Sequence, residues 1–227
     1  MDILSELNPE QRRAVQHDGG PLLILAGAGS GKTKTLTHRI AYLISQRGIF
    51  PSRILAVTFT NKAAREMRQR LADMLGEDAS DRRFMPWMGT FHSMCVRLLR
   101  IDGMSIGLNR NFIIYDEDDR LGLIKQLMKS RGLTDRDIKP RRIAAAISAA
   151  KNDMLSPVKQ QMAELFAAYE AAMHRAGALD FDDLLLKAVE LLRSSPDIRH
   201  KWQQQFRHIL VDEYQDTNAV QYALIKL

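Results

Sequence analysis

Apolar residues follow two kinds of pattern along the first 91 positions. Short continuous apolar runs, typical of strands buried on both faces of a parallel sheet, occupy 22–26 and 54–57, with a weaker run at 87–90. Because these strands alternate with helices, the pattern predicts parallel βαβ units. Helical spacing of apolar residues between the runs predicts two helices, carrying Leu36, Ile40, Leu43 and Ile44, then Ala63, Met67, Leu71 and Met74.

The pattern from about residue 92 to residue 206 is helical, with no convincing strand. Asp116 is placed to cap one helix, Pro140 and Pro157 stand where a first helical turn accepts proline, and Gly177 is a plausible stop. This region therefore contains several helices packed around an apolar core. The stripes that predict this core include Leu121, Ile124, Leu127 and Met128, then Met162, Leu165, Phe166, Tyr169 and Met173, then Phe181, Leu184, Leu185, Ala188 and Leu192.

A strand pattern returns at 209–211, directly before two acidic residues. A crossover between parallel strands usually takes a dozen or more residues, and the segment 92–206 is far longer. The sequence thus predicts an α/β domain made of 1–91 and 207–227, interrupted by a helical domain at 92–206.

Composition narrows the class of protein. The 227 residues are 45% hydrophobic and 26% charged, which argues against disorder, collagen and a disulfide-rich secreted scaffold. The single cysteine, Cys95, excludes an intrachain disulfide, and the apolar runs are too short to span a membrane. Together with an N-terminus unlike a signal peptide, these features predict a cytoplasmic protein.

The formal net charge of +6 comes from an excess of basic residues within 1–100. Such an excess favours a polyanionic partner, and a solvated surface is the alternative explanation.

The strongest chemical motif, AGAGSGKT, lies between the first predicted strand and the following helix. Its glycines would let backbone N–H groups surround phosphate oxygens at a helix N-terminus, which favours anions. Lys32 would contact the β- and γ-phosphates and Thr33 would hold Mg²⁺. The usual pattern opens with glycine where this chain has alanine, and a glycine-rich turn without a ligand is the alternative. The predicted nucleotide-binding residues here are Ala26, Gly27, Ala28, Gly29, Ser30, Gly31, Lys32 and Thr33.

Asp212 and Glu213 follow the last predicted strand and supply the second half of a nucleoside-triphosphate site. Asp212 would hold Mg²⁺ opposite Thr33, and Glu213 would accept a proton from the water that attacks the γ-phosphate. Alone, the pair could equally begin a helix. Together with the phosphate loop it favours hydrolysis over transfer to a small substrate, so Lys32, Asp212 and Glu213 are the predicted catalytic residues.

Five segments in order resemble the UvrD/Rep/PcrA group of superfamily 1 DNA helicases. The acidic segment VDEYQDTN resembles the motif that names the group, and four other segments resemble its Q motif, its motifs Ia and Ib and a later motif on the DNA side. The resemblance implies a RecA-like P-loop domain with a helical insert that uses ATP and Mg²⁺. It also implies 3′→5′ movement on single-stranded DNA and unwinding at junctions of single- and double-stranded DNA, in repair or replication. The five segments are 211–218, 7–11, 58–64, 89–93 and 179–185.

The resemblance also assigns residues. Gln11 would bind the adenine edge. Phe59 is either a stacking platform for a base or a core residue, and His92 either contacts the DNA backbone or satisfies a buried hydrogen bond. The DNA-binding residues that it implies are Thr58, Phe59, Thr60, Asn61, Thr90 and His92.

Three aspartates in the segment 179–185 could suggest a metal site, although acids at a helix start fit the helix dipole and are preferred. These residues are Asp180, Asp182 and Asp183.

The resemblance implies a second motor domain that this chain does not contain. We therefore expect the chain alone to bind Mg-ATP weakly, if at all, and neither to hydrolyse it efficiently nor to unwind DNA. The main alternative is a nucleic-acid-binding module with a non-catalytic phosphate loop. A small-molecule kinase is disfavoured, because the tight arginine pair Arg141-Arg142 lies far from the loop in a predicted helix.

Overall fold

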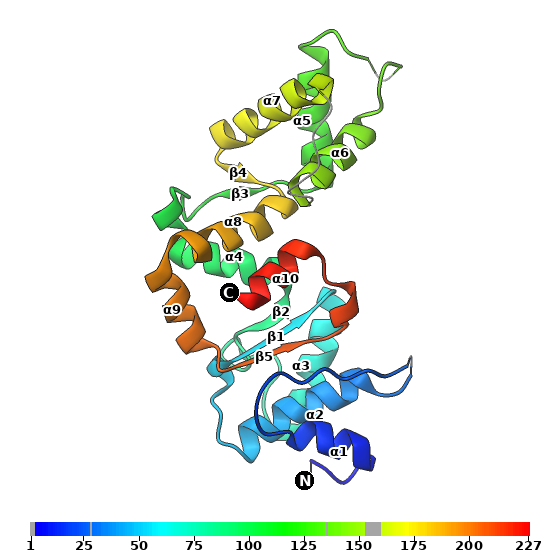
Figure 1. The fold of residues 1–227 in the computed structure, drawn as a ribbon, viewed down its shortest axis with the longest axis vertical. Helices are drawn as coiled ribbons and strands as arrows, with labels where there is room; N and C mark the ends of the chain where they lie inside the picture. The colour runs from blue at the N-terminus through cyan, green and yellow to red at the C-terminus, as the bar shows by residue number, and fades with distance from the viewer. Residues whose placement is uncertain (1–2, 28, 135, 153–159) are drawn as a thin grey trace. The chain divides into compact units, whose positions relative to one another are not determined.

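The computed structural model has a mixed α/β fold with a parallel sheet and many helices (Figure 1). A sheet unit comprises Met1–Met94 and His200–Asp216, and a helical unit comprises Cys95–Arg199 and Thr217–Leu227. The last helix therefore groups with the helical unit, whereas the sequence prediction placed it with the sheet. The structure describes residues 3–27, 29–134, 136–152 and 160–227.

Three parallel strands form the sheet, in the order β2-β1-β5 (Figure 1). β1 (Ile54–Thr58), β2 (Met88–Thr90) and β5 (His208–Val211) confirm the predicted runs at 54–57, 87–90 and 209–211. In register, Thr58 pairs with Thr90 and Val57 pairs with Val211. The carboxyl ends of all three strands therefore meet at one edge, where parallel sheets commonly bind ligands.

The predicted strand at 22–26 is wrong. This segment has no regular secondary structure, and Leu23 and Leu25 are 62% and 86% exposed. A strand needs a hydrogen-bonded neighbour, and no described residue makes a main-chain hydrogen bond to 22–25. The run has the apolar composition of a buried strand, but no strand among the described residues pairs with it and buries it.

The helices of the sheet unit begin at clear capping signals. Asn8 caps α1 (Pro9–Gln16) in a capping box with Gln11, and Thr60 caps α3 (Asn61–Leu75) by accepting a hydrogen bond from the Ala63 N–H. α1 packs on α2 (Lys32–Ser45), and α2 packs on α3 (Figure 1). The two predicted apolar faces of α2 and α3 are confirmed, and they form the core of this unit with Ile40, Ile54, Met67, Leu71 and Met88 among its members.

The helical unit confirms the predicted caps. Asp116 caps α5 (Glu117–Lys129), Pro140 begins α6 (Pro140–Asn152), and Gly177 follows α7 (Gln160–Ala176) with a φ of 60°. Pro157 lies outside the described residues. The remaining helical elements are η1 (Pro51–Arg53), α4 (Phe91–Asp102), η2 (Gly103–Ile106), α8 (Phe181–Ser194), α9 (Pro196–Gln205), η3 (Tyr214–Asp216) and α10 (Ala219–Lys226).

The expectation of no strand in 92–206 is wrong in one place. β3 (Ile113–Ile114) and β4 (Ala178–Leu179) form a short parallel pair. Two-residue strands are too short to show an alternating pattern in the sequence. The pair holds the start of α5 beside the start of α8, which matters for the polar network below.

None of the described helices is long and apolar enough to cross a membrane.

Candidate functional site

The phosphate loop leads into α2 through two glycines that adopt positive φ. Gly29 and Gly31 have φ of 75° and 85°, a region that other residues rarely enter. Gly31 is the N-cap of α2 and offers no side-chain oxygen to the first N–H groups of the helix. Those N–H groups therefore point toward the loop, in the arrangement that favours an anion. The predicted residue Ala28 lies outside the described residues.

Thr33 and Asp212 lie together although they are far apart in the sequence. The Thr33 hydroxyl donates to the two carboxylate oxygens of Asp212, at 3.2 and 3.5 Å. The ladder between β1 and β5 places Asp212, because its N–H donates to the Val57 carbonyl at 2.9 Å. Burial raises the pKa of Asp212 and the charge of Glu213 raises it further, against the hydrogen bond from Thr33. A hydroxyl and a carboxylate side by side are hard oxygen ligands, so this pair fits a Mg²⁺ ion.

Lys32 and Glu213 face each other beside this pair. The Lys32 Nζ lies 3.9 Å from Glu213 Oε2 and donates to the Ala26 carbonyl at 3.1 Å. Both side chains remain partly open to water, and Gln215 donates a hydrogen bond to the Glu213 carboxylate. Glu213 has a φ of 50°, which is uncommon for a non-glycine residue and is often found at functional sites.

Gln11 contacts the phosphate loop directly. Its Nε2 donates to the Ser30 carbonyl at 3.0 Å, while its Oε1 accepts from the Asn8 N–H at 3.1 Å in the capping box of α1. The Gln11 carboxamide therefore ties α1 to the loop. A second side-chain contact within the loop joins the Ser30 hydroxyl to the Gly27 carbonyl at 2.6 Å.

The predicted DNA-binding threonines lie at the carboxyl edge of the same sheet. Thr58 ends β1 and is buried, and it pairs in register with Thr90, which ends β2. Thr60 and Asn61 follow at the exposed start of α3. Polar side chains at the start of a helix can contact phosphate, although the Thr60 hydroxyl also serves as the N-cap.

For Phe59 and His92 the sequence left open either a DNA contact or a buried structural role, and the structure shows both side chains partly buried. Phe59 is half-buried, and its ring meets that of Phe91 edge-on at 5.8 Å. His92 is also partly buried, in the first turn of α4. Gly89 allows this turn to approach β2, because a Cβ there would lie 2.5 Å from the Ser93 hydroxyl.

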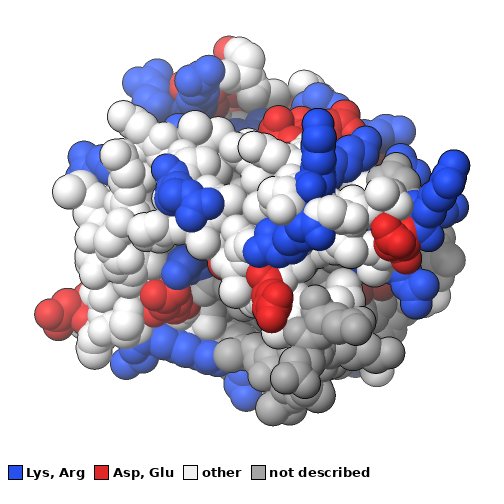
Figure 2. Space-filling view, turned by 90° about the horizontal axis from the view of Figure 1, so that it is seen from above, with Lys and Arg blue, Asp and Glu red and all other residues white. Residues whose placement is uncertain are grey.

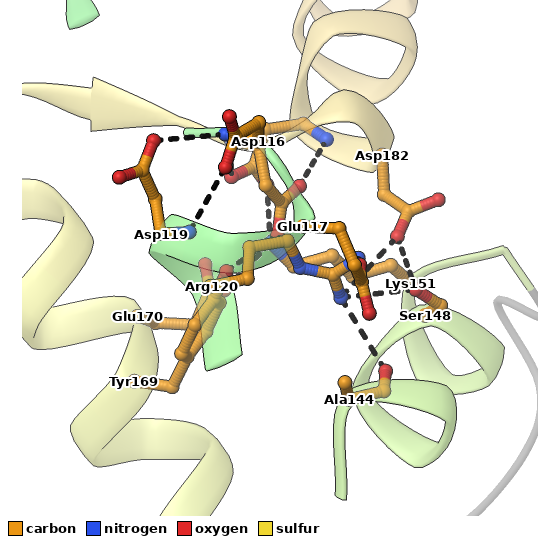
Figure 3. A network of polar contacts seen from close by, with 12 residues as sticks. Asp116, Glu117, Asp119, Arg120, Ala144, Ser148, Lys151, Tyr169, Glu170 and Asp182 are labelled. Carbon is orange, nitrogen blue, oxygen red and sulfur yellow. Dashed lines mark hydrogen bonds and ion pairs between the residues drawn. The ribbon is translucent and has the colours of Figure 1, made fainter. Parts of the chain in front are cut away.

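The aspartates at the start of α8 lie beside two cations, Arg120 and Lys151. Figure 3 labels Asp182 with both cations. Asp180 and Asp183 form a capping box, and Lys151 lies 3.0 and 2.6 Å from their carboxylates. Arg120 lies within 3.6 Å of Asp180 and 3.9 Å of Asp182. Asp180 is the N-cap of α8 and Asp182 and Asp183 lie in its first turn, so these acids do stand at a helix start, as preferred from the sequence. Among the described residues no group of three or more His, Cys, Asp and Glu side chains is placed to hold a metal ion.

We call this cluster the ionic network; sequence reasoning missed its two cations. Lys151 is nearly inaccessible to water and also lies 2.9 Å from Glu170. Burial alone would lower the pKa of Lys151, but Asp183, Asp180 and Glu170 raise it to about 12. The signal available in the sequence was the run of acids itself, because buried carboxylates require a cation from elsewhere in the chain. The network comprises Glu117, Arg120, Ser148, Lys151, Tyr169, Glu170, Asp180, Asp182 and Asp183.

A basic surface surrounds the start of α6. Four basic side chains line a hollow of about 510 Å³, and all four are exposed and make no ion pair with any described residue. The neighbouring Asp137 instead accepts hydrogen bonds from Thr134, which lower its pKa. Figure 2 shows one face of the molecule on which lysine and arginine side chains are more prominent than acids. The basic residues of this surface are Arg136, Lys139, Arg141 and Arg142.

Residues 7–227 match the model of the UvrD/REP helicase N-terminal domain family. The chain is 47% identical over 235 residues to the ATP-dependent DNA helicase PcrA of Leuconostoc citreum, and 47% identical over 234 residues to that of Bacillus subtilis. It is 44% identical over 235 residues to PcrA of Staphylococcus aureus. Each comparison covers 99% of this chain and 31% to 32% of the relative, so the chain spans about a third of the length of these curated relatives.

Proposed function

The chain belongs to the UvrD/REP helicase family, and from this premise we propose that it forms the ATP-binding part of an ATP-dependent DNA helicase. The contact between Thr33 and Asp212 carries the proposal, because it joins the phosphate loop to the acidic motif at 3.2 Å. The PcrA relatives are ATP-dependent DNA helicases by name, which supports the same function here.

In the proposed site, the chain holds the triphosphate from two sides. The N–H groups at the start of α2 and the Lys32 ammonium bind the β- and γ-phosphates. Thr33 and Asp212 would hold Mg²⁺, which neutralises charge that develops on the phosphates. Gln11, tied to the loop through Ser30, binds the adenine edge.

Glu213 is proposed as the general base. It lies beside Lys32, and its carboxylate is open enough to water to receive a proton from an attacking water molecule. The strained backbone at Glu213 favours a functional role, because a positive φ at a non-glycine residue persists only where the surrounding structure holds it.

Single-stranded DNA is the proposed polymer substrate, with the contacts at the carboxyl edge of the sheet. Thr60, Asn61, Thr90 and His92 would contact the backbone, and Phe59 would stack on a base. Thr58 is buried and its hydroxyl donates to the Thr60 carbonyl at 3.1 Å, so it would position this edge of the sheet and not touch the DNA itself. Asp212 and Glu213 follow β5, which is paired with β1, so a change at the phosphates is transmitted over a short distance to the DNA contacts that follow β1. We propose 3′→5′ movement and a role in DNA repair or replication, as the resemblance implies.

The helical unit is proposed to contact duplex DNA through the basic surface around the start of α6. Exposed cations without ion-pair partners bind phosphates by releasing counterions, which makes the affinity depend on salt. We expect Arg141→Ala with Arg142→Ala to weaken junction binding and to reduce the slope of log affinity against log salt by about 1 per lost contact. Arg110→Ala, an exposed arginine of the same unit outside this surface, is the matched control.

The decisive experiment measures ATP hydrolysis by the full-length protein with and without single-stranded DNA. DNA-stimulated turnover that Lys32→Ala and Glu213→Gln both abolish supports the proposal. Glu213→Gln should retain ATP binding, since it removes only the base. DNA binding that both substitutions leave unchanged, in a protein without ATP turnover, would instead favour a nucleic-acid-binding module with a non-catalytic phosphate loop.

For the chain by itself, we propose weak ATP binding and neither efficient hydrolysis nor unwinding. The short span relative to the PcrA proteins supports this expectation. Robust DNA-stimulated hydrolysis by the isolated 227-residue chain would contradict it.

A further inference from the structure

Gln11 is held at the phosphate loop in one orientation of its carboxamide. Its Oε1 accepts from the Asn8 N–H and its Nε2 donates to the Ser30 carbonyl. The flipped carboxamide would lose both bonds, because its oxygen would face the carbonyl and its N–H₂ group would face the N–H. Gly31 lets the loop approach this closely, since a Cβ there would lie 2.9 Å from Gln11 Nε2. The orientation of Gln11 is therefore fixed by contacts within the sheet unit.

The fixed carboxamide keeps one donor and one acceptor for a ligand. A carboxamide carries two N–H donors and two oxygen lone pairs, and its contacts with the described residues Asn8 and Ser30 use one of each. Adenine offers a matching acceptor at N7 and a matching donor at N6, whereas guanine offers acceptors at both N7 and O6. A guanine base would place its O6 against the Gln11 oxygen. This orientation is therefore complementary to adenine and not to guanine.

Arg39 of α2 holds the other end of α1. Its Nη1 donates to the carbonyls of Ala14, Val15 and His17 at 3.3, 2.9 and 3.0 Å, and we call these three hydrogen bonds the Arg39 clamp. The last carbonyls of a helix have no partner within the helix, so a guanidinium there satisfies them and complements the helix dipole. Arg39 follows Lys32 by two helical turns, so the helix that begins at the phosphate loop also carries the clamp.

The position of α1 depends on such contacts. The helix has eight residues, too few to be stable in isolation, and it packs on α2 (Figure 1). Gln11 precedes the fully buried Val15 by one turn, so it moves whenever this part of α1 moves. A group that recognises a base by hydrogen bonds must be held to within about 0.5 Å. Loss of the Arg39 clamp would free one end of this short helix and displace the Gln11 carboxamide from the base.

We propose that Arg39 is a positioning residue that makes the ATP site selective for adenine over guanine. It holds α1 so that Gln11 presents its remaining donor and acceptor to the base. Arg39 itself contacts neither base nor phosphate in this proposal. The inference rests on the proposed function, because it requires a site that binds ATP with Gln11 at the adenine edge.

Arg39→Met in the full-length protein tests the inference. The readout is kcat/KM for ATP divided by kcat/KM for GTP, both measured as DNA-stimulated hydrolysis. This ratio does not depend on the fraction of folded protein, so a loss of stability alone leaves it unchanged. A good bidentate pair with a base gives about 5- to 150-fold discrimination, so we expect the ratio to fall at least about 3-fold. The KM for ATP should rise while kcat stays within about 2-fold, because Gln11 contacts the base and not the reacting phosphate.

Arg68→Met is the matched control. Arg68 of α3 is also half-buried and donates to three main-chain carbonyls, those of Phe84, Met85 and Met88, none of which belongs to α1. Burial lowers the pKa of both Arg39 and Arg68, so the two guanidinium groups have similar surroundings. Arg68→Met should destabilise the sheet unit as Arg39→Met does, but it should leave the ratio of ATP to GTP within about 2-fold. An equal fall in both variants would show that the ratio follows stability and would contradict the inference.

Two further variants show whether Arg39 acts through Gln11. Gln11→Ala should bring the ratio toward unity, and the addition of Arg39→Met should lower it no further. Arg39→Lys keeps the charge and a donor for the carbonyls, so it should lower the ratio less than Arg39→Met, and it replaces that variant if methionine prevents folding. An unchanged ratio in whichever Arg39 variant folds would overturn the inference, as would losses that multiply in the double variant.

Calorimetric titration with ATP and with GTP separates this inference from the proposed function. The ratio of the two dissociation constants requires no hydrolysis, so it measures selection of the base even in a protein that never hydrolyses ATP in the presence of DNA. Such a protein would contradict the proposed function. Equal affinity of the unsubstituted protein for ATP and GTP would contradict the inference. DNA-stimulated hydrolysis with a preference for ATP that Arg39→Met leaves unchanged would contradict the inference alone.

Discussion

Lys32 in the sheet unit and Lys151 in the helical unit both lie against carboxylates, but water reaches them very differently. The Lys32 side chain is 26% exposed and lies 3.9 Å from one glutamate. The Lys151 side chain is 3% exposed and lies within 3.0 Å of three carboxylates. Lys32 therefore keeps charge and space for a ligand, whereas the charge of Lys151 is neutralised within the protein. Burial, more than residue type, separates the lysine that we propose binds phosphate from the lysine that stabilises the helical unit.

The contrast between the two lysines predicts that substitution of Lys151 causes the largest loss of stability. Lys151→Met leaves Glu170, Asp180 and Asp183 without their cation and should lower the free energy of unfolding by about 3–5 kcal/mol. Far-ultraviolet circular dichroism during urea unfolding measures this loss. Trp87 and Trp202 both lie in the sheet unit and contact each other, so their fluorescence reports separately on that unit.

The control for this experiment is Lys187→Met, which removes a lysine of α8 paired at 2.7 Å with the half-exposed Glu190. Exposed pairs contribute about 0–1 kcal/mol, so this variant should unfold almost like the unsubstituted chain. Equal losses of unfolding free energy in Lys151→Met and Lys187→Met would contradict the claim that burial makes the Lys151 ion pairs important for stability.

The second effect concerns function. Lys32→Ala should lower the rate of DNA-stimulated ATP hydrolysis by the full-length protein about 100-fold or more, since a charge aimed at the transferred phosphate acts chiefly in the transition state. The free energy of unfolding should change by less than about 1 kcal/mol, because Lys32 is partly exposed. Steady-state kinetics and urea unfolding of the same preparation measure both. If Lys32→Ala unfolded easily but hydrolysed ATP at the normal rate, Lys32 would be a structural lysine and its contrast with Lys151 would be wrong.

The third effect is a pH dependence in the ionic network. Burial, and the charges of Asp180 and Glu170, raise the pKa of Asp183 to about 6 against the opposing charge of Lys151. Between pH 4 and 6 the folded state then holds a proton at Asp183 that the unfolded state has lost, so stability falls as pH rises. We expect a fall of about 1–3 kcal/mol across this window, which Asp183→Asn should flatten. Urea unfolding at several pH values measures the slope, and an equally steep slope in Asp183→Asn would assign the titration elsewhere.

The smallest effect is expected at Lys34, two residues beyond Lys32 in the same helix. Its Nζ lies 3.2 Å from Glu6, with side-chain exposures of 40% and 71%. Lys34→Ala should change the free energy of unfolding by less than about 1 kcal/mol and leave ATP turnover within about 2-fold. Thermal unfolding and the same kinetic assay measure this variant. A large loss of turnover would show that proximity to the loop, and not the position of Lys32, controls catalysis.

The sequence predicted the parts of the fold that depend on local pattern. Long amphipathic helices such as α3 and α8 and the runs of β1 and β5 repeat a spacing that burial requires, so they are found where expected. The segment 22–26 failed because pairing with a neighbour, not composition, makes a strand. The pair β3 and β4 was missed because two residues carry no period.

In the candidate ATP site, too, local sequence pattern predicts some features while others depend on packing. The sequence motifs predict which residues are functional, and the structure brings two of these residues, Thr33 and Asp212, within 3.2 Å of each other. No local pattern, however, could assign Lys151 and Arg120 to the aspartates of α8, since these partners come from other helices. Long-range ion pairs depend on packing and are not apparent from the spacing of residues along one helix.

The exposed leucines at 22–25 and the outer edge of β5 also affect how this polypeptide behaves in solution. Leu25 is 86% exposed, and β5, with Ile209 45% exposed, is an edge strand among the strands of the residues that the structure describes. Apolar side chains and an unpaired strand edge are a template on which other polypeptides can add strands. The formal charge of +6 opposes such contact by mutual repulsion, and salt screens that repulsion. The polypeptide by itself should therefore stay monomeric most readily at low ionic strength, and it should self-associate through the sheet unit as salt and concentration rise.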